Sequence, residues 1–136
     1  MKKIIFIFTL LITLNTFGQE HLTNDYVQLS SIYFQQGSTK INDGQRQMIW
    51  DQGRYFEFTN TISKIVFKVF CTSNEYNGYG GDKFLLKRVR TIKNILIKDC
   101  NVDSTRFITI LIGNKITTNN NPSANRRVDI EILTQK

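Results

Sequence analysis

The sequence predicts an α+β domain with a mixed sheet, in which the elements follow in the order strand, helix, strand, helix, strand, strand. Two observations predict this class. Four short segments are dense in β-branched and aromatic residues, and two segments between them carry apolar residues at helical spacing. The 136-residue chain is long enough for one domain with a substantial core, and we see neither an internal repeat nor a second domain.

The first residues have the pattern of a secretory signal peptide. Lys2 and Lys3 form a basic head, residues 4–14 form an apolar core, and Gly18 supplies a small residue for cleavage. The apolar core is shorter than the roughly 20 residues that a membrane-spanning helix needs, so an uncleaved anchor is the weaker alternative. We therefore expect residues 1–18 to be removed, which leaves a mature chain without a transmembrane segment.

The expected mature chain consists of a short polar linker, residues 19–26, and one domain over residues 27–136. No cysteine precedes Cys71, so lipid attachment to a cysteine directly after the signal is excluded. We expect the domain in the periplasm, either free there or associated with the outer membrane.

Composition narrows the classes of function. The formal net charge is +7, and loss of the two lysines of the signal peptide leaves +5. This balance suits an anionic polymer such as the cell wall, or simply good solubility. Nucleic acid is not expected as a partner, because the chain is exported and its cations form no stripe. The only histidine, His21, lies in the linker, which argues against histidine-based catalysis and multi-histidine metal sites. The domain also offers no Ser/His/Asp set, and nothing fixes the geometry of a carboxylate pair between Asp82 and Glu75, so we expect no enzyme, no cofactor and no metal site.

The first strand and the first helix are predicted over residues 27–34 and 44–56. The strand is rich in β-forming residues, and a polar loop over 35–40 follows it. Asn42, Asp43 and Gly44 are typical of a helix start or a turn. The helix carries apolar side chains on one face, and Trp50 is expected in the core. These apolar side chains are Met48, Ile49, Tyr55 and Phe56.

Residues 64–71 are dense in β-branched and aromatic side chains, which predicts a buried strand. A glycine-rich loop is expected after it, with Gly78, Gly80 and Gly81 among tyrosines and asparagines. The side chains of Tyr76, Asn77 and Tyr79 could stack on a sugar or peptide, although glycine-rich loops are more often plain connectors.

The second helix has the clearest pattern in the chain. Asp82 is a plausible N-cap, and apolar residues then recur at steps of four, three and four. These residues are Leu85, Val89, Ile92 and Leu96.

Two further strands complete the domain. Residues 107–113 form an apolar run after a turn at 99–104, and residues 126–133 alternate apolar and charged side chains after a polar loop. Right-handed crossovers place the second and third strands parallel, and the roughly 12-residue loop allows the last strand to return antiparallel.

At these residues the chain resembles the OmpA-like C-terminal domain family. Residues 125–128 match the family's N-R-R-V signature at the start of the last strand. Residues 84–89 match its N-x-x-L-S-x-x-R-A signature in part and keep the arginine as Arg88, and residues 101–106 look like the family's linker before the third strand. The resemblance covers about residues 27–133 and implies a two-layer β-α-β-α-β-β sandwich with two helices on one face of a mixed sheet.

The resemblance also implies a ligand site. In the family, the aspartate of a G-H-T-D signature and the helix arginine grip the diaminopimelate end of the peptidoglycan stem peptide. Here that signature aligns with residues 70–73, which keep only Thr72, and Ser73 stands at the aspartate position. Serine can accept a hydrogen bond from the ammonium group of this zwitterion but cannot supply the opposite charge, and Glu75 or Asp82 is the candidate replacement. The candidate ligand-binding residues are Arg88, Thr72, Ser73, Asn74, Asn125, Arg126 and Arg127.

Each of these candidates has a structural alternative. Arg88 could be an ordinary surface charge of its helix, and Arg126 and Arg127 could brace the ends of loops. Asn125 is more typical of a turn cap than of a ligand contact. Two hypotheses of function follow. The first is a module that binds peptidoglycan non-covalently. The second is a structural module, or one that interacts with other envelope proteins, that kept the fold after losing wall recognition.

Cys71 and Cys100 are expected to remain unpaired, although an exported chain meets an oxidising compartment. They lie near opposite ends of the second helix, which is about 24 Å long at 1.5 Å per residue. A disulfide needs Cα atoms within about 7 Å, so the predicted fold holds these thiols apart as small buried hydrophobes.

Overall fold

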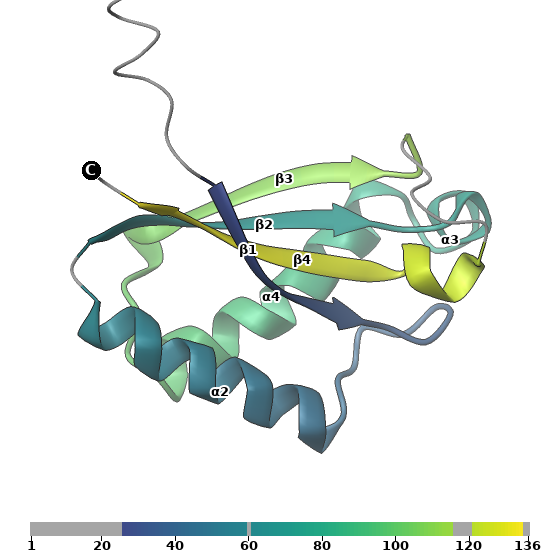
Figure 1. The fold of residues 1–136 in the computed structure, drawn as a ribbon. Helices are drawn as coiled ribbons and strands as arrows, with labels where there is room; N and C mark the ends of the chain where they lie inside the picture. The colour runs from purple at the N-terminus through teal and green to yellow at the C-terminus, as the bar shows by residue number, and fades with distance from the viewer. Residues whose placement is uncertain (1–25, 60, 116–120, 135–136) are drawn as a thin grey trace, which may run out of the picture.

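A computed structural model describes residues 26–59, 61–115 and 121–134. The predicted signal peptide and almost all of the linker lie outside the described residues. Within them, four strands form one sheet in the order β1-β4-β2-β3, and helices α2 and α4 cover one face of it (Figure 1). The strands are β1 (Tyr26–Tyr33), β2 (Ile62–Phe70), β3 (Phe107–Gly113) and β4 (Arg127–Thr134).

The sheet has the predicted mixed topology. β2 and β3 pair in parallel, with Phe67 opposite Thr109, and the α4 crossover joins them. β4 lies between β1 and β2 and is antiparallel to both. The expected α+β two-layer fold, with two helices on one face, is therefore confirmed.

The helices bury the faces that their spacing predicts. α2 (Asp43–Phe58) begins with a capping box in which Asn42 and Gln45 satisfy each other's backbone N–H groups. α4 (Asp82–Lys98) buries all four residues of its predicted apolar face against β2 and β3. Gly81 rather than Asp82 occupies its N-cap position, and Asp82 is the first helical residue. Trp50 is half-buried at the edge of the core, where its indole N–H donates to Asp99 at 2.9 Å.

The glycine-rich segment after β2 differs from the expected loop, because it begins with a short helix, α3 (Ser73–Gly78). Thr72 accepts a hydrogen bond from the Glu75 N–H, and the Glu75 carboxylate accepts one from the Thr72 N–H. This capping box satisfies the first turn and outweighs the flexibility that the later glycines introduce. A 3-10 turn, η2 (Pro122–Asn125), likewise forms part of the expected polar loop before β4.

The two cysteines are free and buried, as predicted. Cys71 follows β2, where its N–H donates to Gly113 at 3.0 Å, while Cys100 lies beyond the far end of α4 against Gly53 of α2. No helix in the described part of the chain has both the length and the apolar character that a membrane span requires.

Candidate binding site

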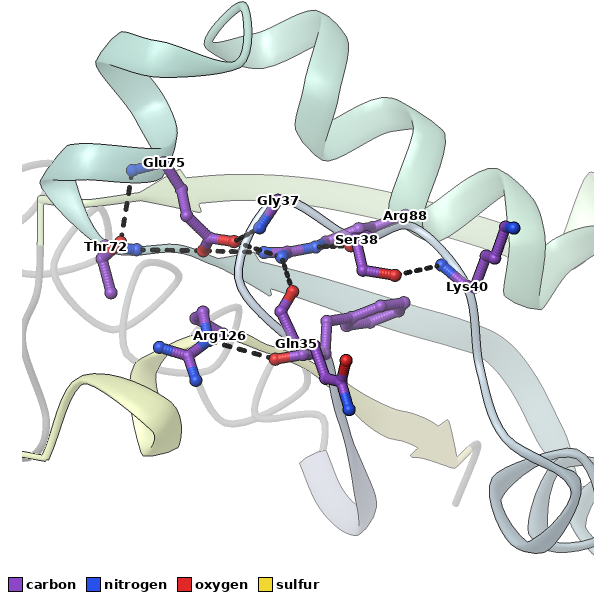
Figure 2. A network of polar contacts seen from close by, with 9 residues as sticks. Gln35, Gly37, Ser38, Lys40, Thr72, Glu75, Arg88 and Arg126 are labelled. Atoms are coloured by element: carbon purple, nitrogen blue, oxygen red, sulfur yellow. Dashed lines mark hydrogen bonds and ion pairs between the residues drawn. The ribbon is translucent and has the colours of Figure 1, made fainter.

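An ion pair between Arg88 and Glu75 lies at the centre of the candidate site, and both side chains are completely buried (Figure 2). Arg88 comes from the second turn of α4 and Glu75 from α3. The Arg88 Nη1 donates to Glu75 Oε1 at 3.0 Å, and Nη2 donates to Oε2. The pair is thus bidentate, which is the strongest arrangement for a guanidinium and a carboxylate.

The same two side chains hold the segment that connects β1 to α2. Arg88 Nε donates to the Ser38 carbonyl at 2.9 Å, and Nη2 donates to the Gln35 carbonyl at 3.2 Å. Glu75 Oε2 accepts from the Gly37 N–H at 3.0 Å. Gly37 has a φ of +68°, a conformation that favours glycine. The buried pair therefore fixes the backbone of residues 35–38.

Aromatic rings enclose the guanidinium of Arg88. Its Cζ lies 4.9 Å from the ring centroid of Phe34 and 4.5 Å from that of Phe84. Both rings are buried, and they exclude water from the ion pair while favouring its cation. In this conformation Arg88 is inaccessible to a ligand.

Arg126 holds Phe34 from the other side. Its carbonyl accepts the Phe34 N–H at 2.8 Å, and its Nε donates to the Phe34 carbonyl at 3.1 Å. Its two terminal nitrogens have no partner among the described residues, and the side chain is only half-buried. Arg88 and Arg126 therefore lie on either side of one backbone segment (Figure 2). Arg88 is buried, whereas the half-buried Arg126 keeps both terminal nitrogens available among the described residues.

A pocket of about 700 Å³ adjoins this segment. The connection between β1 and α2, the first turn of α2 and the turn before β4 enclose it. Arg126 and the exposed Lys40 bring positive charge to the pocket, and no acidic side chain is among the described residues that line it. Those lining residues are Tyr33, Phe34, Gln35, Ser38, Lys40, Ile41, Asn42, Gln45, Ser123, Ala124 and Arg126.

The predicted site residues converge at one end of the sheet but have different surroundings. Thr72 caps α3, while Ser73 and Asn74 are exposed, and Ser73 Oγ accepts from the Asn114 side chain at 3.2 Å. Asn125 is buried in the 3-10 turn before β4. Of these residues, Thr72 contacts the buried pair through Glu75, and none of the four is among the described residues that line the pocket.

Arg127 points to the opposite face of the sheet from Val128 of the core. Its guanidinium lies 3.9 Å from the ring centroid of Phe70, and its Nε donates to Asp129 at 3.0 Å. It also donates to the Ala124 carbonyl at 2.8 Å. Arg127 thus braces the end of the loop before β4, one of the two roles considered from the sequence.

Two parts of the site had a weak signal or none in the sequence. Glu75 was named only as a possible substitute for the missing aspartate, although Thr72 and Glu75 have the spacing of a capping box. One wall of the pocket, with Lys40, comes from the loop after the first strand, whose polar residues resemble those of any other loop.

The titratable groups near the site include one buried thiol. Burial, with a further contribution from Glu75, raises the pKa of the Cys71 thiol to about 11, which makes it a poor nucleophile near neutral pH. Among the described residues, histidine, cysteine and carboxylate side chains form no cluster suited to a metal ion.

Comparison with solved structures identifies the class of fold. The OmpA-like domain of FopA1 from Francisella tularensis superposes with a TM-score of 0.61 at 20% identity, covering 85% of this chain and 88% of that one. The peptidoglycan-associated lipoprotein from Burkholderia pseudomallei gives 0.63 at 17% identity, over 79% and 91%. The C-terminal domain of Helicobacter pylori MotB gives 0.66 at 15% identity, over 79% and 88%.

The described residues therefore form a mixed α+β sandwich of the class that these three structures share. More particularly, the chain has the OmpA-like fold, which the sequence signatures predicted. No protein-family model and no curated protein matches the sequence itself.

Proposed function

We propose that this protein is a non-enzymatic module of the bacterial cell envelope that binds peptidoglycan non-covalently. In this proposal a carboxylate of the stem peptide enters the pocket beside Arg126. The observation that carries the proposal is the combination of two unpaired guanidinium nitrogens, an exposed lysine and a lining without acidic side chains. Such a pocket attracts anions, and a guanidinium with two free nitrogens matches the geometry of a carboxylate.

The fold supports the choice of polymer. Two of the similar structures are a peptidoglycan-associated lipoprotein and the periplasmic domain of MotB. An exported chain with this fold would meet the wall in the periplasm. The proposal is also compatible with an association of the protein with the outer membrane. Arg88, the expected ligand residue, acts in this proposal through Gln35 and Ser38, whose backbone it fixes beside the pocket.

A pull-down on purified sacculi tests the proposal. The mature chain, residues 19–136, should sediment with sacculi, and Arg126→Gln should weaken binding by at least about tenfold, since a charge-assisted hydrogen bond contributes roughly 1.5–3 kcal/mol. Arg90→Gln is the matched control, because Arg90 is an exposed arginine of α4 that does not line the pocket. Equal binding of wild type and Arg126→Gln would place the ligand elsewhere.

The buried Arg88–Glu75 pair favours one alternative function. A protein whose ligand arginine is permanently paired could keep the fold while interacting with other envelope proteins and not with the wall. The sacculus pull-down distinguishes this alternative. Wild-type protein would then stay in the supernatant at low salt, even at protein concentrations up to about 100 µM.

A further inference from the structure

We infer that the pocket selects carboxylates and discriminates against ligands that carry a nearby ammonium group. This inference rests on the proposed function and specifies which feature of the wall peptide is recognised. It starts from the carboxylate of Glu75, the acid closest in sequence to the missing aspartate, which already has partners for both oxygens.

Glu75 is unavailable to an ammonium group for two reasons. Its side chain is completely buried, and its two oxygens accept from Arg88 Nη1 and Nη2, from Gly37 N–H and from Thr72 N–H. Four donors occupy the lone pairs that a carboxylate offers. Releasing it would leave the Arg88 cation buried without a counter-charge, a change that costs several kcal/mol.

The charges that remain at the pocket are positive. Lys40 and Arg126 line it, and the described lining residues include no acid. The side chain of Asp129 on the sheet is committed to Ser31, at 2.6 Å, and to Arg127. A ligand ammonium group would therefore meet like charge without a compensating carboxylate, whereas a ligand carboxylate would meet only attraction.

Pimelate and diaminopimelate form a direct test, since they share the seven-carbon dicarboxylate and differ only in the two amino groups. Each is titrated into the mature chain by calorimetry and is used to compete with sacculi. We expect pimelate to bind at least about threefold more tightly, the effect of like charges roughly 6 Å apart in a solvated site. Tighter binding of diaminopimelate, or binding of neither compound, would overturn the inference.

Two variants sharpen the test. Gln35→Glu introduces an acid on an exposed residue that lines the pocket, and it should shift the preference toward diaminopimelate. Gln36→Glu makes the same charge change on the adjacent exposed residue, which does not line the pocket, and should leave the preference unchanged. An equal shift in both variants would show that net charge, and not the pocket, sets the preference.

The two proposals fail differently. Sacculus binding that depends on Arg126 but is competed better by diaminopimelate overturns the selectivity and leaves the proposed function standing. Pimelate binding in the calorimeter without sacculus binding supports the selectivity of the pocket and removes peptidoglycan as its occupant.

Discussion

At the scale of single residues, the buried Arg88–Glu75 pair gives Arg88 a structural role in the fold. A bidentate carboxylate is what such an arginine would take from a ligand, and here the protein supplies it from α3. Burying the two charges costs desolvation free energy. Other N–H groups of Arg88 donate to backbone carbonyls of residues 35–38, and aromatic rings pack against its guanidinium, and these contacts offset that cost. Its function in the fold is therefore to order the wall of the pocket.

Glu75→Gln should destabilise the protein by about 3 kcal/mol or more, because it leaves the Arg88 cation buried beside a neutral side chain. Glu57→Gln is a suitable control, since Glu57 is exposed on α2 and surface changes are usually within about 0.5 kcal/mol. Urea unfolding followed by circular dichroism measures both. A loss below about 1 kcal/mol for Glu75→Gln would contradict the buried pair.

Cys71 provides a prediction about pH. Burial, and then the charge of Glu75, raise its pKa from 9.0 to about 11, so the folded state keeps the thiol neutral more strongly than the unfolded state does. The associated stability is fully present below about pH 9 and is lost as the pH rises through about 11. Urea midpoints between pH 8 and 11 should fall less steeply for Cys71→Ala than for wild type. Parallel slopes would show that the thiol titrates normally.

At the scale of elements, the contact between α2 and α4 depends on Gly53. A Cβ at this position would lie 2.6 Å from the Cβ of Cys100 and 3.2 Å from Leu96 Cδ2, and it would also overlap the Cys100 sulfur. The glycine thus allows the end of α4 to approach α2 closely, although glycine inside a helix weakens it by roughly 0.5–1 kcal/mol.

Alanine substitutions in α2 test this contact. Gly53→Ala should lower the free energy of unfolding by about 1–3 kcal/mol, the usual cost of overpacking. Gly44→Ala, in the first turn of the same helix, meets only Asn42 Oδ1 at 3.5 Å and should be neutral or slightly stabilising. Thermal unfolding of both variants compares them directly. Equal effects would mean that α2 and α4 are not in close contact.

The elements also show what the sequence could predict. The spacing of Leu85, Val89, Ile92 and Leu96 defines the buried face of α4 without any knowledge of its partners, because helical periodicity is a local property. The sequence does not predict α3, because Gly78, Gly80 and Gly81 indicate a loop more strongly than the Thr72–Glu75 capping box indicates a helix. The burial of Arg88 could not be predicted, because it depends on Gln35 and Ser38, which are about fifty residues away.

At the scale of the whole molecule, the proposed function draws on both the basic balance of the chain and the open cationic pocket. The net charge is +7 for the full chain and +5 without Lys2 and Lys3. In the proposed function this charge favours approach to an anionic polymer, and the pocket adds the specific contact. The buried pair keeps the pocket walls in place without contributing a free charge. Recognition then depends on exposed cations, which respond to salt.

Binding to sacculi should accordingly weaken as salt is raised, because exposed charges are screened over about 8 Å at physiological ionic strength. We expect a several-fold loss between 50 and about 300 mM NaCl in the pull-down. The Arg126→Gln variant should show a shallower dependence, since it lacks one of the cations concerned. Salt-independent binding would point to an apolar surface instead.

The central claim is that the wall ligand occupies the pocket beside Arg126 and leaves the Arg88–Glu75 pair intact. Titration of a soluble peptidoglycan fragment into the isotope-labelled mature chain, followed residue by residue by NMR, tests this most directly. The account predicts the largest shift changes in residues 33–45 and 123–126, with the Arg88 side-chain N–H signals still protected from exchange. Changes centred on Thr72–Asn74, with loss of that protection, would show that the ligand displaces Glu75, and would contradict it.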